Sequence, residues 1–279
     1  MRELDSFHRN HLLATLIGPG CERLQSQLEL VHLTRGDVLY ESNSRLRQAY
    51  FPTTSIVSLL SVMEDGASDE IAFVGNDGIV GVPLFMGGET TPSRAVVRSA
   101  GYAFRMQGQM LQHEFKRSSS VQHLLLRYTQ ALLTQIAQTG ACNRHHSLHQ
   151  RLCRWLLSCL DYLPVNEIRI THEEIAGMLG VRRESISEEA GELQTAGLIH
   201  YRRGRMIVVD RPKLETRACE CYRGIRREFT RLLTDSVTRA HSLGSASALG
   251  RHLRVPPPGH GREWKPCPPS RCSASLRDP

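Results

Sequence analysis

The chain has 279 residues, of which 40% are hydrophobic and 23% are charged, and its formal net charge at pH 7 is +7. This length suggests two domains, because single hydrophobic cores stop growing at about 250 residues. No run of about 18 apolar residues occurs, and the polar start MRELDSFHRN lacks a secretory signal's apolar core, so we expect a cytoplasmic protein without a membrane partner.

Residues 31 to about 106 are predicted to form β structure, because short apolar runs alternate with Gly, Asp, Asn and Pro. IVSLLSVM and EIAFV, joined by EDGASD, predict a hairpin with Gly66 in its turn. VGNDGIVGV predicts a second tight turn at residues 76–78, and AVVRSAGYAFRM predicts another hairpin, bent at Gly101. Many short strands at this spacing indicate a sandwich or barrel.

A long amphipathic helix is predicted from about residue 110 to 139. The stripe of apolar residues along this helix is wider than a single surface helix needs. We therefore expect one side of the helix to pack on the β domain and the other side to pack on a second copy of the chain. A core helix within one chain is the alternative. The stripe comprises Val121, Leu124, Leu125, Tyr128, Leu132, Leu133, Ile136 and Thr139.

A second domain is expected to begin with a helix over SLHQRLCRWLLSCLDYL, which Pro164 ends. His145, His146 and His149 lie at its start, and the outer two could share a helix face as paired zinc ligands do. No general-base Glu stands between them and arginines flank them, so we interpret them as surface or interdomain residues.

The eight cysteines show no paired C-x2-C spacing of the kind found in zinc sites and iron–sulfur clusters. Cys219 and Cys221 form a lone C-x-C. We interpret the cysteines as mostly free thiols and predict no metal site and no cofactor. They lie at positions 21, 142, 153, 159, 219, 221, 267 and 272.

A helix-turn-helix is predicted from Thr171 onward. Thr171 followed by Glu174 is the S/T-x-x-E capping pattern, and Gly180 ends the first helix. A second helix starts near Arg182 or Arg183, and in this arrangement its N-terminal residues enter the major groove of DNA. The expected inner face of the second helix consists of Ile186, Ala190 and Leu193.

Two arginines at the positive end of a helix are unfavourable by about 0.3–1 kcal/mol each, and DNA phosphates or guanine edges would offset this. Arg183 could donate two hydrogen bonds to O6 and N7 of a guanine, and Glu184 could accept a hydrogen bond from the amino group of a cytosine. Ser185 or Ser187 could donate a hydrogen bond to a base or to a phosphate. The alternative is an ion pair between Arg183 and a neighbouring glutamate on a solvated face.

GLIHYRRGRMIVVDR predicts two strands linked around Gly204, a basic wing whose arginines contact the sugar–phosphate backbone. Residues 200–279 contain 17 Lys and Arg against 7 Asp and Glu, which favours a polyanionic partner, although surplus arginine can also form a solvated surface. The predicted DNA-binding residues are Thr171, Arg182, Arg183, Glu184, Ser185, Ser187, Arg202, Arg203 and Arg205.

This order of elements resembles the Crp/Fnr family of bacterial transcription regulators over residues from about 30 to 215. The best matching stretches are ITHEEIAGMLGVRRESIS, GLIHYRRGRMIVVDR and YFPTTSIVSLL…EDG…GNDGIVGVPLFMGG. The resemblance implies an α+β fold with three parts. These are a cyclic-nucleotide-binding-like β-roll (double-stranded β-helix, 1–108), a dimerisation helix (109–143) and a winged helix-turn-helix (144–214). The remaining residues, 215–279, form a basic extension, and their Ser-, Pro-, Gly- and Arg-rich composition predicts disorder after about residue 243.

The resemblance further implies a homodimer on a two-fold operator in double-stranded DNA, with RNA polymerase as a candidate partner. Arg183, Glu184 and Ser185 match the family's R-E-[ST] base-reading positions. Glu188 departs from the pattern, because the best-known members carry a DNA-contacting arginine there, so the operator sequence cannot be carried over.

A second departure lies in the effector pocket, where cyclic-AMP-binding members use G-E-[LI] and, later, R-[ST]-A. The corresponding residues here are Gly81-Val82-Pro83 and Ser93-Arg94-Ala95. The missing Glu and an Arg shifted to the opposite strand face argue against a cyclic nucleotide. The candidate pocket, with Arg94 as an anion contact and the effector unspecified, consists of Gly81, Val82, Ser93, Arg94 and Ala95.

Two other classes of protein fit parts of the sequence. A cupin-like metalloenzyme needs a His/Glu cluster on the strands, and residues 31–106 contain one histidine, His32. A small-molecule-binding module whose winged domain docks on protein is disfavoured by the C-terminal positive charge.

The cysteine cluster of iron–sulfur family members is absent, since the N-terminus has only Cys21. We therefore predict a DNA-binding regulator and not an enzyme.

Overall fold

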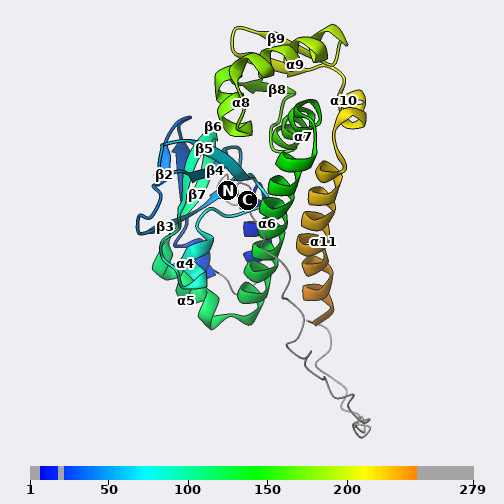
Figure 1. Ribbon diagram of the computed structural model, residues 1–279. Coiled ribbons are helices and arrows are strands. Elements are labelled where there is room, and N and C mark those ends of the chain that lie inside the picture. Colours follow the sequence, from blue (N-terminus) through cyan, green and yellow to red (C-terminus); the bar gives the residue numbers. More distant parts are fainter. Residues whose placement is uncertain (1–6, 18–21, 244–279) are drawn as a thin grey trace, which may run out of the picture.

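Two antiparallel β-sheets face each other in the N-terminal half and enclose a common core (Figure 1). The computed structural model describes residues 7–17 and 22–243. The sheets have the strand orders β1-β7-β3 and β2-β6-β4-β5, and this half is the predicted β-roll. The strands are β1 (Glu29–Leu33), β2 (Val38–Tyr40), β3 (Gln48–Pro52), β4 (Ile56–Val62), β5 (Ser68–Val74), β6 (Ser93–Ser99) and β7 (Gly101–Gln107).

Two of the three predicted turns are confirmed. β4 and β5 form the first hairpin around Gly66, and the second turn closes through a 3.2 Å hydrogen bond from the Gly78 N–H to the Gly75 carbonyl. The third hairpin is wrong, because β6 pairs with β2 and β4 while β7 pairs with β1 and β3. A Cβ at Gly101 would lie 2.6 Å from the carbonyl carbon of Thr54, so close backbone approach explains this glycine.

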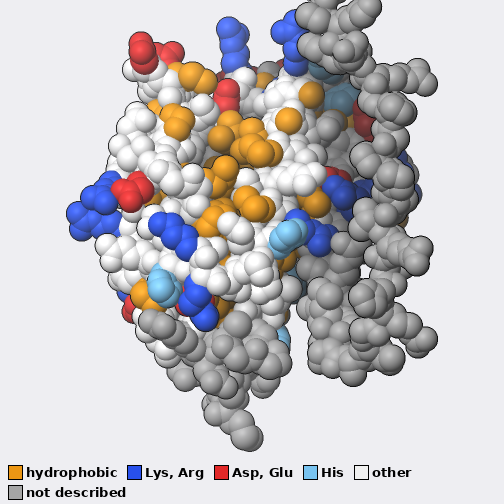
Figure 2. All heavy atoms as spheres, turned by 90° about the horizontal axis from the view of Figure 1, so that it is seen from below, with side chains coloured by type: hydrophobic (Ala, Val, Ile, Leu, Met, Phe, Trp, Pro, Cys, Tyr) orange, Lys and Arg blue, Asp and Glu red, His pale blue; other side chains and the backbone are white. Residues whose placement is uncertain are grey.

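Short helices flank the β-roll: α2 (His11–Leu16), α3 (Glu22–Gln25) and α4 (Val82–Met86). The side chain of Asn10 caps α2 and donates to the carbonyls of Pro52 and Gly78, at 2.7 and 2.9 Å, which fixes α2 on the β-roll. Seen from below, hydrophobic side chains gather near the middle of the molecule (Figure 2). Met86 of α4 is one of the exposed hydrophobic residues.

The predicted long helix is divided in two at Ser118. α5 (Gly108–Arg117) ends there, and α6 (Ser119–His145) begins there and runs farther than expected. Ser118 has extended backbone angles, and its side chain accepts from the N–H of Val121, so it acts as the N-cap of α6. The run of three serines therefore interrupts a helix that the apolar periodicity alone predicts as continuous.

A C-terminal helix that the sequence did not predict, α11 (Glu220–Leu243), lies along α6 (Figure 1). The ring of Phe229 packs edge-on against Tyr128 of α6, with their centroids 6.3 Å apart, and Phe229 and Leu232 are buried. Part of the wide apolar stripe of α6 is thus covered within the chain. The predicted disorder after residue 243 lies outside the described residues.

The winged domain has its own core and one more strand than predicted. β8 (Glu167–Arg169) joins the sheet β8-β10-β9, in which β9 (Ile199–Arg202) and β10 (Arg205–Val208) form the wing. Around it lie α7 (Leu148–Leu160), α8 (His172–Leu179), α9 (Arg183–Thr195) and α10 (Arg211–Arg217). The core includes Leu152, Trp155, Ile186, Leu193 and Met206. No helix in the described part of the chain is long and apolar enough to span a bilayer.

Candidate DNA interface

The first helix of the helix-turn-helix begins and ends at the predicted residues. The Thr171 side chain accepts from the N–H of Glu174 at 3.2 Å, and the Glu174 carboxylate accepts from the N–H of Thr171 at 2.8 Å. This reciprocal capping box satisfies amides that would otherwise lack partners at the start of α8. Gly180 ends α8 in the left-handed conformation, at φ 61°, and the chain then turns into α9.

The second helix, α9, presents its two arginines to solvent. Arg182 is the N-cap and Arg183 the first residue, and both are exposed. Glu184 and Ser187 are also exposed and Ser185 is half-buried, while Ile186, Ala190 and Leu193 are buried as predicted. Among the described residues, no carboxylate lies within ion-pair distance of either arginine. The alternative in which Arg183 pairs with a neighbouring glutamate is therefore not adopted in this conformation.

The wing lies beside the start of α8. Arg203 and Gly204 join β9 to β10, and both have positive φ, 49° and 74°, as a two-residue type I′ hairpin turn requires. The Gly204 carbonyl accepts from the N–H of Ile170 at 2.9 Å, which places the wing tip next to Thr171. Arg202, Arg203 and Arg205 are exposed at this tip, and Arg205 has a carboxylate partner, Glu167, at 3.7 Å.

Two residues that the sequence analysis did not select connect these parts. The ring of His172 stacks on Tyr201 of β9, with centroids 4.1 Å apart, and its Nδ1 is 2.9 Å from the hydroxyl oxygen of Ser187 on α9. Partial burial, and then the charge of Arg183, lower the pKa of His172, which favours the neutral form of this ring. A hollow of about 370 Å³ is lined here by Thr171, His172, Glu173, Arg183 and Tyr201.

The candidate effector residues lie on two elements of the β-roll. Gly81 is the N-cap of α4 and Val82 its first residue, whereas Ser93, Arg94 and Ala95 belong to β6. The Nε of Arg94 forms an ion pair with Glu41 at 3.0 Å, so part of its charge is already neutralised. Ala95 is fully buried and offers no polar group.

A buried polar contact joins the β-roll to the winged domain. The side chains of Glu70 on β5 and Arg98 on β6 form an ion pair and are 5% and 4% exposed. The indole N–H of Trp155 on α7 donates to Glu70 at 3.1 Å, and the guanidinium of Arg98 lies 4.8 Å from the Trp155 ring centroid. Burial lowers the pKa of Arg98, and the nearby Cys159 acts in the opposite direction.

A second contact between the domains lies at the turn after β5. The hydroxyl of Tyr162 donates to the Asp77 carboxylate at 2.7 Å, and burial raises the pKa of Asp77 to about 6. Both residues line a cavity of about 540 Å³ that also reaches α2, α6 and α11. A second cavity, of about 650 Å³, lies beside Arg98 between β-roll and winged domain. Neither of these two cavities is lined by the candidate effector residues.

Comparison with known protein families matches both halves of the chain. The model of the cyclic nucleotide-binding domain matches residues 30–118, and the model of the Crp-like helix-turn-helix domain matches residues 150–217. No curated protein sequence gives a significant match. The fold and the helix-turn-helix define a β-roll regulator with a DNA-binding domain. Since the two matched segments span more than half of its length, the chain belongs to the Crp/Fnr family of transcription regulators.

Solved structures share this fold at low sequence identity. FixK2 from Bradyrhizobium japonicum has a TM-score of 0.60 at 16% identity, over 69% of this chain and 98% of that one. A putative Crp/Fnr-family transcriptional regulator from Eubacterium rectale has a TM-score of 0.59 at 18% identity, over 73% and 96%. The c-di-GMP-responsive regulator CLP from Xanthomonas campestris has a TM-score of 0.56 at 18% identity, over 71% and 99%.

Proposed function

We propose that this chain is a sequence-specific transcription regulator, not an enzyme, that binds a two-fold operator in the cytoplasm as a homodimer. The observation that carries this proposal is the group of arginines on one exposed surface. Arg182 and Arg183 extend from the start of α9 without carboxylate partners among the described residues, and Arg202 and Arg203 lie on the adjacent wing. Such a surface suits base edges at its centre and phosphates at its rim.

Within this surface the residues have different roles. Arg183, Glu184 and Ser185, at the N-terminal turn of α9, would read base edges in the major groove, with Ser187 beside them. The wing arginines, together with Arg182 and Thr171, would contact the backbone and set the position of the protein on DNA. RNA polymerase remains a candidate further partner of the DNA-bound protein.

The proposed dimer rests on an exposed stripe of α6 that α11 does not cover. His123, Leu126, Gln130, Leu133 and Ala137 are exposed and follow one another at alternating steps of three and four residues, the spacing of a coiled-coil seam. Leu126 is 47% and Leu133 59% exposed, so both leucines are free to pack against a second copy of the helix. Pairing this stripe with its copy would bury both leucines and set two copies of α9 about a two-fold axis.

We further propose that the β-roll does not bind cyclic AMP. Val82 stands in place of the expected glutamate, and Arg94 is engaged with Glu41. Calorimetric titration of the full chain with cyclic AMP and cyclic GMP should show no saturable heat at millimolar nucleotide. Saturable binding that Arg94→Ala abolishes would contradict this.

The DNA proposal is tested by selecting bound fragments from randomised DNA and then comparing variants on the selected operator and on random DNA. Arg183→Ala should lose discrimination worth about 1–3 kcal/mol, because one bidentate base contact disappears. Arg203→Ala should weaken binding to the operator and to random DNA alike. The slope of log affinity against log salt concentration should also become shallower, by an amount that corresponds to about one lost phosphate contact. Arg45→Ala, on the β-roll, is the matched control and should change neither.

Two outcomes would count against this proposal. If Arg183→Ala kept the full ratio of operator to random binding, α9 would not be the recognition helix. If the wild-type protein showed no salt-dependent retention on DNA, the winged domain would be better explained as a protein-docking module.

A further inference from the structure

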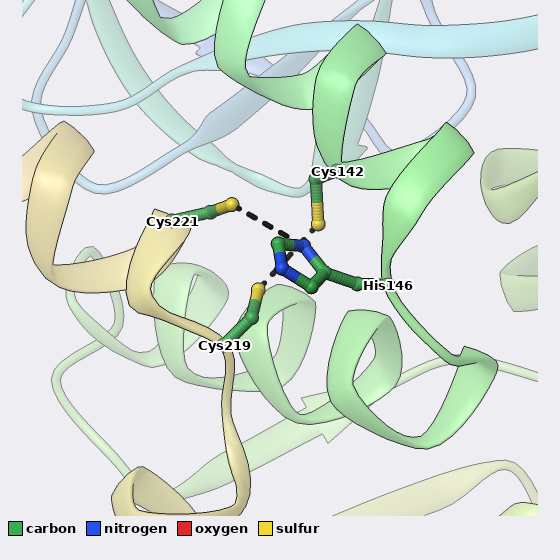
Figure 3. Close-up of side chains that lie close together, drawn as sticks. All are labelled: Cys142, His146, Cys219 and Cys221. Carbon is green, nitrogen blue, oxygen red and sulfur yellow. Dashed lines mark hydrogen bonds between the residues drawn. The ribbon is translucent and has the colours of Figure 1, made fainter.

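Four potential metal ligands from two distant parts of the chain point toward one another where α6 meets α11 (Figure 3). Cys142 lies in the last turn of α6 and His146 is its C-cap, while Cys219 and Cys221 flank the first residue of α11. Their ligand atoms all lie within 4.8 Å of one another. The three cysteines are buried, and the side chain of His146 is 18% exposed.

Local structure explains why these side chains converge. Residues four apart share a helix face, and the N–H of His146 still donates to the carbonyl of Cys142, at 3.1 Å, so both side chains leave α6 on the same side. The carbonyl of Cys219 accepts from the N–H of Tyr222 at 3.2 Å, which turns the chain into α11 and brings Cys221 close to Cys219.

The distances suit a single tetrahedral ion. The sulfurs of Cys142 and Cys219 are 3.5 Å apart, and the sulfur of Cys221 is 3.5 Å from Nδ1 of His146. A tetrahedral zinc ion, with Zn–S of about 2.3 Å and Zn–N of about 2.0 Å, holds its ligand atoms about 3.5–3.8 Å apart. Three thiolates and one imidazole are a usual structural zinc set, and their softness disfavours Ca²⁺ and Mg²⁺.

The surroundings of the four ligands support the same interpretation. Nε2 of His146 lies 3.2 Å from a carboxylate oxygen of Glu220, which would fix the ring with Nδ1 free to bind metal. The amide of Gln138 donates to the sulfur of Cys221 at 3.0 Å, a contact that stabilises a thiolate. The guanidinium of Arg154, buried in the adjacent α7, interacts electrostatically with Cys142 and would offset the negative charge of three thiolates.

We propose that Cys142, His146, Cys219 and Cys221 bind one zinc ion that fastens the start of α11 to the end of α6. This replaces the expectation of free thiols without a metal site. A disulfide between Cys142 and Cys219 would leave His146 and Cys221 without a role. An iron–sulfur cluster distributes its thiolates over several iron atoms and spaces them farther apart than one ion does.

The position of the site gives the metal a structural consequence. α7, the first helix of the DNA-binding domain, begins at Leu148, two residues after His146. The ion would therefore hold the joint between the proposed dimerisation helix and the winged domain, and would anchor α11 at its N-terminal end. Metal binding to such a site contributes directly to the stability of the folded chain.

The first experiment measures metal in the full-length protein purified without chelators and with a thiol reductant. Elemental analysis should give close to one zinc per chain in the wild type and far less in Cys219→Ser and in Cys221→Ser. Cys153→Ala, which removes another buried thiol outside the cluster, is the matched control and should keep its zinc.

A second measurement does not depend on cysteine variants that could fold poorly. Replacing zinc by Co²⁺ in the wild type should give intense visible bands of tetrahedral cobalt and thiolate-to-cobalt charge transfer in the near ultraviolet. Glu220→Gln changes an exposed side chain and leaves all four ligands in place. It should weaken Co²⁺ binding about tenfold, since residues that orient a ligand typically contribute at least this much.

Three results would overturn the proposal. One is a folded, reduced wild-type protein that contains no stoichiometric metal and takes up no Co²⁺. Another is retention of zinc by both cysteine variants at the wild-type level. The third is acid-labile sulfide in the purified protein, which would indicate an iron–sulfur cluster instead of a single ion.

Discussion

Arg35 of the β-roll forms an ion pair with Glu174 of α8, whose carboxylate also completes the capping box with Thr171. The β-roll thus contacts the first helix of the helix-turn-helix at a residue next to the proposed DNA surface. A movement of either domain that breaks this pair would leave the capping box intact, because Thr171 and Glu174 belong to the same helix end.

Arg35→Ala and Glu174→Ala should therefore differ, although both remove the same ion pair. Arg35→Ala should change the free energy of unfolding by less than about 1 kcal/mol, since both side chains are partly exposed. Glu174→Ala also removes the hydrogen bond to the Thr171 N–H and should cost more, about 1–2 kcal/mol. Urea denaturation checks this prediction, and equal losses for the two variants would contradict it.

The buried ion pair of Glu70 and Arg98, to which Trp155 of the winged domain donates a hydrogen bond, should cost more to break than the exposed pair of Arg35 and Glu174. Arg98→Met leaves the Glu70 carboxylate buried without its cation and should reduce the free energy of unfolding by about 3–5 kcal/mol. The double variant Glu70→Gln/Arg98→Met removes both charges and should recover much of the loss. A double variant as unstable as Arg98→Met alone would mean that the ion pair itself is not the source of the stability.

Asp77 should make stability depend on pH. Its pKa is raised to about 6 in the folded protein, so the folded state keeps a proton that the unfolded chain releases near pH 4. The free energy of unfolding should therefore fall as the pH rises from about 4 through 6 and stay lower above that window. Asp77→Asn should lack this component, and denaturation at several pH values should show its advantage over the wild type growing toward neutral pH. A constant difference would contradict the assignment.

The exposed leucines of α6 should decide the oligomeric state. The double variant Leu126→Lys/Leu133→Lys places charges on the proposed seam and should shift the mass measured by light scattering from dimer to monomer. Leu30→Lys, at a similarly exposed leucine on β1, is the matched control. If the wild-type protein were a monomer, the proposed dimer would be excluded. If the double variant remained dimeric, the dimer contact would lie elsewhere on the chain.

The helix-turn-helix could be predicted because its signals are local. The capping pair Thr171 and Glu174, the turn residue Gly180 and the inner spacing of α9 depend on residues within one or two helical turns. The basic wing is similarly contained in a short hairpin. The third strand of its sheet, β8, was missed because three residues carry too little periodicity to be recognised.

The errors arose where long-range packing overrides a local pattern. The sequence around Gly101 has the form of a hairpin, but the pairing of β6 and β7 with different sheets is fixed by strands far away in the chain. The proximity of the four proposed zinc ligands was likewise beyond local patterns, since Cys142 and Cys219 are 77 residues apart. Only the folding of α11 back along α6 brings them together.

That arrangement of α11 has a practical consequence for any shortened form of the protein. A chain cut after α10 would retain both matched domains, yet it would lose Phe229 and Leu232 and leave Tyr128 and its apolar neighbours on α6 facing water. Bare apolar surface of this kind drives non-specific association. A fragment designed from the domain boundaries alone should therefore aggregate, whereas one that extends through α11 should stay dispersed.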